Sequence, residues 1–369
     1  MFGSSSRGRV CEAPASFVEQ QSGTPPLPLL LERMTAASPP RPAEFDNPAI
    51  PEIATTDVPL CPLCGQGHFH TFAEGYDYEL QTSRNKWRFV ECDACSHVWL
   101  NPRPAISTLG VIYPTTYYAY NYAAKINPIA VKAKEMLDVA KMKAILAHLK
   151  RAPRSFLDVG CGDGRFLKVM EKKGVPRERD YGLELDEAVL VPLKKAGYQV
   201  ACERVEDSTL VPNGSLDLVT MFHVIEHVDD PGPVIRKLAT WMAPGGVLAI
   251  ETPNLDALDQ RLFHDSYWGG YHIPRHWNLY TAKTLARQLN DAGLEPVATM
   301  YQTGHSFWMY SMHHWMRFEG NPHLRLAKLF DPIGSLAFLA GFTLWDKLRG
   351  RFGFRTSAVL MLARKPENT

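Results

Sequence analysis

The pattern of hydrophobic and polar positions changes character along the chain. From residue 128 onward, short apolar runs typical of buried strands alternate with segments whose apolar residues recur at helical spacing. The strands predicted in this part are residues 155–159, 181–185, 199–202, 217–221, 296–301 and 357–363. Strands that alternate with helices indicate an α/β fold with a parallel, doubly wound sheet, whose ligands lie beyond the carboxyl ends of the strands.

The first part of the chain lacks this pattern. Residues 1–58 are rich in Pro, Ser and Ala, and we expect them to be disordered because they offer too little apolar surface to offset the entropy of ordering. The apolar run at 27–31 is interrupted by Pro28 and follows no positive segment, so we expect neither a signal peptide nor a membrane span. Met34 is an alternative translation start.

Four cysteines form two CxxC pairs, Cys61 with Cys64 and Cys92 with Cys95. Four thiolates at this spacing favour a structural, tetrahedral zinc site in a small zinc ribbon at 59–104. A rubredoxin-like iron site and unligated buried thiols are the alternatives. Clustered cysteines without a signal peptide also favour a reducing compartment, and we expect the protein to be cytoplasmic.

Three glycines at alternate positions, Gly160, Gly162 and Gly164, follow the strand at 155–159 and precede a helix. Glycines allow a ligand to lie against bare backbone. A dinucleotide fingerprint places its last two glycines three residues apart, whereas here they are two apart. Asp158 and Asp163 would also repel a pyrophosphate, but they would attract a ligand that carries an ammonium and a sulfonium, such as S-adenosylmethionine.

Residues 158–164 resemble motif I of the class I S-adenosylmethionine-dependent methyltransferases, and the segments at 181–186, 216–228 and 243–246 resemble later motifs of that family, in the same order. The resemblance implies a Rossmann-like, seven-stranded, doubly wound sheet whose last strand runs antiparallel between the fifth and sixth. The methyltransferase domain would span 151–369, with insertions at 253–280 and 303–355, after a linker and leading helix at 105–150.

The resemblance also implies which residues hold the cofactor. Glu184, at the end of the second strand, would hold both ribose hydroxyls, and Val205 and Glu206 would lie near the adenine. The residues predicted to bind the cofactor are Asp158, Gly160, Cys161, Gly162, Gly164, Glu184, Val205, Glu206 and His223.

Methyl transfer needs mainly positioning, but a hydroxyl or acidic carbon acceptor also needs a base near neutral pH. The candidate bases, in order of preference, are His223, His276 and His272. Residues 223–227 also match the HxxEH signature of a zinc peptidase class. That site requires a long helix, whereas these residues join a strand end to a turn at 229–233, so we disfavour a peptidase.

The branch of the family that the chain resembles implies a small-molecule acceptor, such as a sugar, a polyketide-like or a quinone-like compound. One alternative is an RNA base methyltransferase with a zinc ribbon, but a net charge of +1 argues against nucleic acid as a partner. The other alternative is a scaffold that has lost catalysis, and the intact motif I argues against it.

The insertion at 303–355 is rich in aromatic residues and methionine in its first half and contains an apolar run at 332–345. That run is too short to span a bilayer. We expect a helical hairpin packed on the core, and the alternative is a peripheral membrane contact through 332–345.

Overall fold

The computed structural model describes residues 41–114, 128–319, 323–331 and 335–367. The predicted disorder of residues 1–40 and the alternative start at Met34 lie outside these ranges. The structure differs from the predicted disorder at residues 41–58, which contain a short 3-10 helix at Ala43–Asp46 and strand β1 at Thr55–Thr56. The cause is Phe45, which is fully buried and stacks on Tyr76 at 4.9 Å between ring centroids.

A seven-stranded sheet forms the centre of the larger part, in the order β12-β13-β10-β9-β6-β7-β8. Its strands are β6 (Phe156–Val159), β7 (Asp180–Glu184), β8 (Gln199–Cys202), β9 (Leu216–Phe222), β10 (Met242–Pro253), β12 (Glu295–Gln302) and β13 (Ala358–Arg364). β13 lies between β10 and β12 and is antiparallel to both. The predicted Rossmann-like fold class is therefore confirmed, including the antiparallel last strand.

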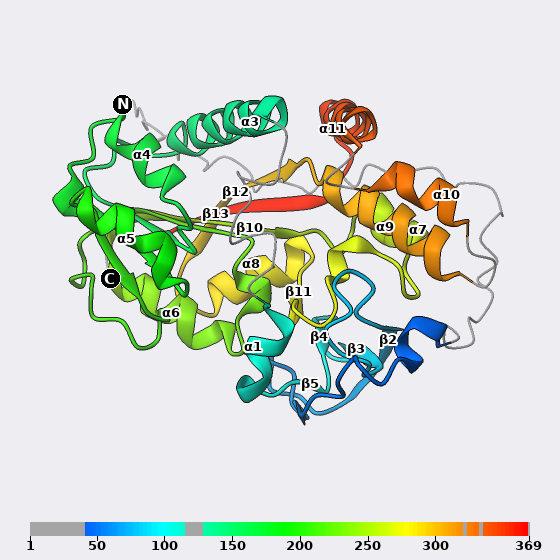
Figure 1. Cartoon of the computed structure of the whole chain (residues 1–369). Coiled ribbons are helices and arrows are strands. Elements are labelled where there is room, and N and C mark those ends of the chain that lie inside the picture. The colour runs from blue at the N-terminus through cyan, green and yellow to red at the C-terminus, as the bar shows by residue number, and fades with distance from the viewer. Residues whose placement is uncertain (1–40, 115–127, 320–322, 332–334, 368–369) are drawn as a thin grey trace, which may run out of the picture. The chain divides into compact units, whose positions relative to one another are not determined.

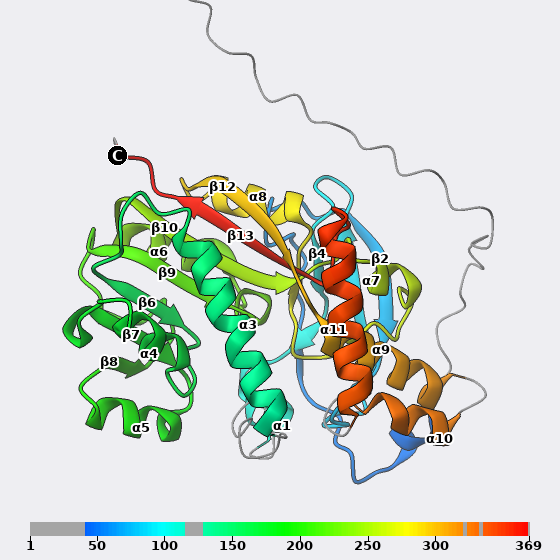
Figure 2. The ribbon, with the colours of Figure 1, turned by 90° about the horizontal axis from the view of Figure 1, so that it is seen from above.

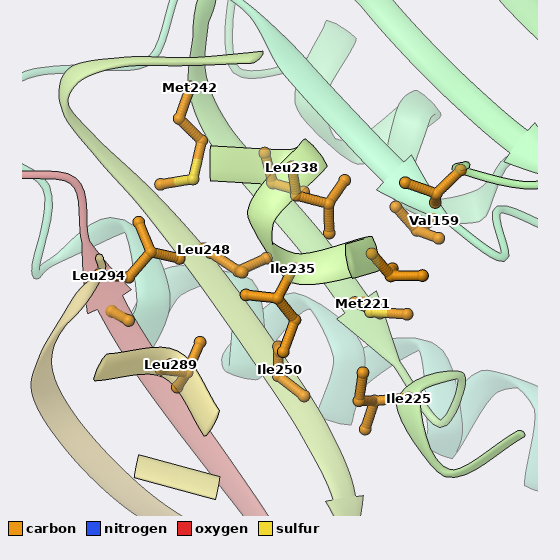
Figure 3. Packing of buried hydrophobic residues seen from close by; sticks show 14 of the residues in the cluster. Val159, Met221, Ile225, Ile235, Leu238, Met242, Leu248, Ile250, Leu289 and Leu294 are labelled. Atoms are coloured by element: carbon orange, nitrogen blue, oxygen red, sulfur yellow. The ribbon is translucent and has the colours of Figure 1, made fainter. Parts of the chain in front are cut away.

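Helices cover both faces of this sheet (Figure 1). They are α3 (Pro128–Leu146), α4 (Arg165–Glu171), α5 (Glu187–Lys195), α6 (Pro231–Trp241) and α8 (Ala282–Asn290). Two shorter helices lie apart from these faces: α1 (Leu109–Ile112) contributes Ile112 to the core around the smaller sheet, and α7 (Leu258–Leu262) belongs to the insertion at 253–280. Alternate residues of β10 serve the two faces, as a central strand requires. Leu248 and Ile250 pack against Ile235 of α6 (Figure 3), while Val247 and Ala249 belong to the core under α3, α4 and α5.

A smaller, four-stranded sheet has the order β11-β4-β3-β2. Strands β2 (Phe69–Gly75), β3 (Trp87–Cys92) and β4 (Val98–Leu100) come from the cysteine-containing segment, and β5 (Arg103–Pro104) pairs with β1. The fourth strand, β11 (Asn278–Leu279), comes from the insertion at 253–280 and pairs with β4. Segments far apart in the sequence thus share one sheet.

A buried ion pair holds the same two segments together. Arg275 donates hydrogen bonds from Nη1 to Asp77 Oδ1 at 3.1 Å and from Nη2 to Asp77 Oδ2 at 3.0 Å, and both side chains are fully buried. Removing either partner would leave an uncompensated buried charge, which is strongly destabilising. The pair therefore determines how the loop after β2 lies against the insertion.

The second insertion forms α9 (His305–Phe318), α10 (Leu324–Ala327) and α11 (Leu336–Arg351). α11 contacts α9 through Phe342, which stacks on Trp308 at 5.5 Å, and it lies on the same side of the sheet as α3 (Figure 2). α11 nevertheless exposes large apolar side chains, including Leu344 and Trp345. None of the described helices is long and apolar enough to cross a membrane. Residues 332–334 lie outside the described ranges, and the membrane contact through 332–345 stays a prediction.

Candidate active site

A cleft of about 2050 Å³ lies at the carboxyl edge of the seven-stranded sheet. The ends of β6, β7, β9 and β10 line it, together with residues of α3, α11 and the insertion at 253–280. The predicted site residues that line the cleft are Asp158, Gly160, Cys161, Gly162, Glu184, Val205, Glu206, His223, His272 and His276. Gly164 does not belong to the lining and instead begins α4.

The three glycines of the loop after β6 all have positive φ, at 75°, 51° and 73°. A Cβ at Gly160 would lie 2.5 Å from Val224, and one at Gly164 would lie 2.5 Å from Leu193, so these two positions exclude a side chain because of protein packing. A Cβ at Gly162 would meet nothing within 4 Å. The space beside Gly162 is therefore open to a ligand.

Two carboxylates lie beside this loop. Asp158 is buried and accepts a hydrogen bond from Thr220 Oγ1 at 2.7 Å through Oδ1, while its Oδ2 has no hydrogen-bond partner among the described residues. Burial raises the pKa of Asp158 to about 7. Glu184 accepts from the Gly162 N–H at 3.0 Å and from the Leu185 N–H at 2.7 Å. A cationic ligand would compensate the charge that burial disfavours at Asp158.

His223 follows β9 and lies between two carboxylates. Its Nδ1 is 3.3 Å from Glu226 Oε1, and its Nε2 is 3.6 Å from Glu251 Oε1. Burial would lower the pKa of His223, but the hydrogen bonds and charges of Glu226 and Glu251 outweigh it and raise the pKa to about 9. His223 is therefore an imidazolium at neutral pH and has no lone pair with which to accept a proton.

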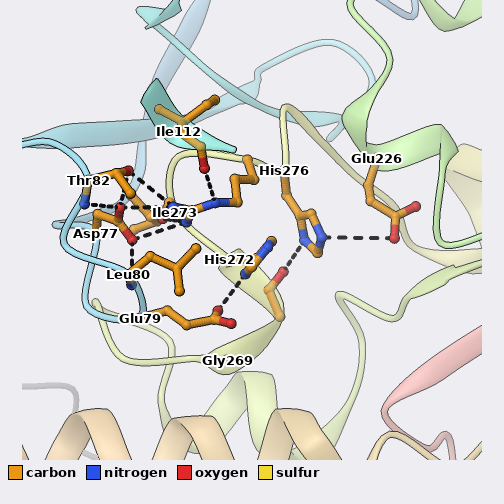
Figure 4. Close-up of polar contacts among 12 residues, drawn as sticks. Asp77, Glu79, Leu80, Thr82, Ile112, Glu226, Gly269, His272, Ile273 and His276 are labelled. Carbon is orange, nitrogen blue, oxygen red and sulfur yellow. Dashed lines mark hydrogen bonds and ion pairs between the residues drawn. The ribbon is translucent and has the colours of Figure 1, made fainter. Parts of the chain in front are cut away.

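The other two candidate bases come from the insertion at 253–280 and line the same cleft. His272 Nδ1 lies 2.5 Å from Glu79 Oε2, and both side chains are buried (Figure 4). His276 Nδ1 hydrogen-bonds the Gly270 carbonyl at 2.8 Å. Burial, with further contributions from the charges of His227 and His272, lowers the pKa of His276 well below its ordinary value. The cleft is thus lined by a carboxylate-paired imidazole, His272, and by a second imidazole, His276, whose pKa is lowered.

Glu79 was not predicted as a site residue. It follows β2 and is separated from His272 by 193 positions in the sequence. No local pattern around Glu79 distinguishes it from a surface glutamate, so the sequence carried no signal for this pair. The signal that existed was indirect, because the histidines at 272 and 276 identified the insertion as a part of the site.

The four predicted metal-ligating cysteines lie together. Cys61 Sγ is 3.6 Å from Cys95 Sγ, and Cys64 Sγ is 3.5 Å from Cys92 Sγ. All four sulfur atoms lie within 4.8 Å of one another. A tetrahedral ion with metal–sulfur bonds of about 2.3 Å would separate its ligands by about 3.8 Å, so the cluster fits a four-thiolate metal site.

Comparison with known proteins agrees with the geometry of the cleft. Residues 134–299 match the family model described as "Methyltransferase domain". The chain contains an S-adenosylmethionine-dependent methyltransferase domain. The match spans β6 to β10, which carry the glycine loop, Glu184 and His223.

Curated proteins named "Ubiquinone biosynthesis O-methyltransferase" are similar in sequence to this methyltransferase domain. The protein from Xanthomonas axonopodis pv. citri (strain 306) is 33% identical over 126 residues, which cover 33% of this chain and 53% of that protein. The one from Methylococcus capsulatus is 29% identical over 130 residues, which cover 34% of this chain and 54% of that protein. The chain thus spans about half the length of these curated relatives.

Among solved structures, a SAM-dependent methyltransferase from Archaeoglobus fulgidus is similar with a TM-score of 0.41 and 18% identity, over 63% of this chain and 94% of that chain.

Proposed function

We propose that the protein transfers a methyl group from S-adenosylmethionine to an oxygen atom of a small molecule. The observation that carries this proposal is the open space at Gly162 together with the buried carboxylate of Asp158, whose Oδ2 has no hydrogen-bond partner among the described residues. That combination suits a ligand with cationic groups and no phosphate. The ubiquinone biosynthesis O-methyltransferases that resemble this domain support a small acceptor and methylation at oxygen.

In this proposal each cofactor-binding residue contacts a different part of S-adenosylmethionine. Asp158 attracts the positive charge of the methionine part, and Glu184 accepts hydrogen bonds from the ribose hydroxyls through the lone pairs that its two backbone contacts leave over. Val205 and Glu206, which line the cleft beyond β8, contact the adenine. Gly162 has no side chain, so the space beside its backbone stays open for the ligand.

We assign the role of general base to His272 in preference to His223. Glu79 accepts a hydrogen bond from His272 Nδ1, which leaves the lone pair of the imidazole on Nε2. The acceptor oxygen forms a bond to the methyl carbon as the carbon–sulfur bond breaks, and sulfur keeps the electron pair. His272 takes the proton of the acceptor hydroxyl, and Glu79 stabilises the resulting imidazolium.

We also propose that the four cysteines hold a structural zinc ion, since four thiolates leave no coordination position for a substrate. The ion would stabilise the four-stranded sheet, which contains β11 of the insertion and β2, the strand before the loop of Glu79. Zinc would therefore hold Glu79 and His272 in position without taking part in the methyl transfer.

Titration calorimetry of the purified full chain with S-adenosylmethionine and S-adenosylhomocysteine tests the proposal. We expect saturable binding of both, followed by cofactor-dependent methylation of one or more phenolic or quinol compounds in an acceptor screen. Failure of a folded, zinc-loaded chain to bind either ligand would overturn the proposed function.

A further inference from the structure

A second cluster of metal-ligating groups lies in the wall of the cleft, apart from the cysteines. Glu226 and His227 belong to the 3-10 turn Ile225–His227 after β9, and His276 belongs to the insertion. One carboxylate oxygen and one ring nitrogen from each histidine lie within 4.8 Å of one another. Figure 4 shows His276 pointing toward Glu226, and all three residues line the cleft.

Backbone carbonyls determine how both histidines are protonated. His276 Nδ1 lies 2.8 Å from the Gly270 carbonyl, and His227 Nδ1 lies 3.0 Å from the Arg275 carbonyl. His227 Nδ1 also lies 3.0 Å from the Tyr113 hydroxyl. A carbonyl oxygen only accepts, whereas a hydroxyl can also accept, so a proton on each Nδ1 satisfies all these contacts and each Nε2 carries a lone pair. Histidines that ligate metals show this arrangement, in which the second ring nitrogen donates to a carbonyl or carboxylate.

The lone pair of His276 faces a carboxylate rather than a donor. Its Nε2 lies 3.9 Å from Glu226 Oε1, which is too far for a hydrogen bond. Glu226 is fully buried, its Oε1 contacts His223 at 3.3 Å, and its Oε2 has no hydrogen-bond partner among the described residues. His223 contacts only Oε1, so Oε2 stays buried without a partner in the described part of the chain, which is costly, and a metal ion bound by this carboxylate would supply the missing partner.

We propose that Glu226, His227 and His276 bind a divalent first-row transition-metal ion. Two imidazoles and one carboxylate suit ions such as Mn²⁺, Fe²⁺, Co²⁺ or Zn²⁺ and leave coordination positions open toward the cleft. The role of this ion rests on the proposed function: it would bind the acceptor through its hydroxyl oxygen and lower the pKa of that hydroxyl. The acceptor is then a hydroxyl compound whose proton passes to His272.

Cobalt is a suitable probe because its absorption reports its ligands, and thiolate ligands give a spectrum distinct from that of nitrogen and oxygen ligands. The full chain, with zinc already in the cysteine site, is titrated with Co²⁺. We expect one Co²⁺ per chain with a nitrogen and oxygen spectrum and a rise in the unfolding temperature. Glu226→Gln and His276→Asn should each weaken Co²⁺ binding about a hundredfold, since loss of even an outer-sphere partner costs about 10–100-fold.

The matched control is His148→Asn, which replaces an exposed histidine outside the cleft and should bind Co²⁺ as the wild type does. Calorimetry with S-adenosylmethionine on the same samples shows that each variant is folded. A wild-type chain that binds Co²⁺ only with a thiolate spectrum, or not at all, overturns the metal site, as does unchanged binding in both variants. Co²⁺ binding without cofactor binding would instead overturn the proposed function and leave the metal site standing.

Discussion

The two sides of the cleft are built in opposite ways. The proposed cofactor side, comprising Asp158, the loop 160–164 and Glu184, comes from two neighbouring strands, β6 and β7, and from the turn between β6 and α4. The proposed acceptor side, comprising Glu79, Glu226, His272 and His276, comes from three segments that meet only in the folded protein. The cofactor side is thus nearly independent of the small sheet, whereas the acceptor side depends on it.

Because the two sides come from separate segments, we expect mutations to separate cofactor binding from the chemical step. A defect in the cofactor side should appear as lost affinity for S-adenosylmethionine. A defect in the acceptor side should leave that affinity intact and appear in the rate of transfer or in acceptor binding.

The largest effect is expected on the acceptor side. His272→Gln removes the proposed base and should lower kcat by about 10²–10⁴-fold, the usual contribution of general base catalysis. The dissociation constant of S-adenosylmethionine, measured by calorimetry, should stay unchanged. Glu79→Gln should lower kcat less, because the imidazole remains. Equal kcat in wild type and His272→Gln would remove His272 from the mechanism.

The next largest effect concerns Gly162. Gly162→Val should weaken S-adenosylmethionine binding by about a hundredfold, or about 2.7 kcal/mol, because the side chain occupies the ligand's space. Gly214→Val is the matched control, since Gly214 also has positive φ, at 67°, and open space around its Cβ. Both variants should lose similar stability from backbone strain. Equal cofactor affinity in the two would show that strain, and not the site, explains any loss.

A smaller effect on the affinity for S-adenosylmethionine is expected from a change of pH. The pKa of Asp158 is raised to about 7, so its carboxylate forms above pH 7 and is lost as the pH falls below it. If the carboxylate form binds the cationic ligand, the dissociation constant of S-adenosylmethionine should rise by up to about tenfold per pH unit below 7. Calorimetry between about pH 8 and about pH 5.5 measures this slope. Asp158→Asn should bind weakly with no such slope.

The smallest effect on cofactor affinity is expected from the cysteine site. Cys61→Ser should lose the metal ion and destabilise the four-stranded sheet, yet change the S-adenosylmethionine dissociation constant by no more than about threefold, or about 0.7 kcal/mol. Acceptor turnover should fall more, because β11 belongs to that sheet. Metal analysis with calorimetry checks this, and a parallel loss of metal and cofactor affinity would refute the independence of the two sides.

Much of the fold could be predicted from the sequence because its signals are local. The strand at 199–202 has the bounds that the pattern predicted, and Thr281 caps α8 through a capping box with Thr284. The glycine loop and the CxxC pairs were also recognisable, because their spacing alone brings their groups together. These features depend on residues that are neighbours in the chain.

Only the tertiary structure decided which groups meet across the cleft. Glu79 meets His272, and Glu226 meets His276, through packing and strand pairing between distant segments, for which the chain carries no periodic signal. The same holds for protonation, since the pKa of His223 depends on Glu251 from a neighbouring strand. The sequence by itself determined the layered fold and the cofactor loop, because local patterns encode them. The acceptor side required the folded chain, because long-range contacts and burial create its chemistry.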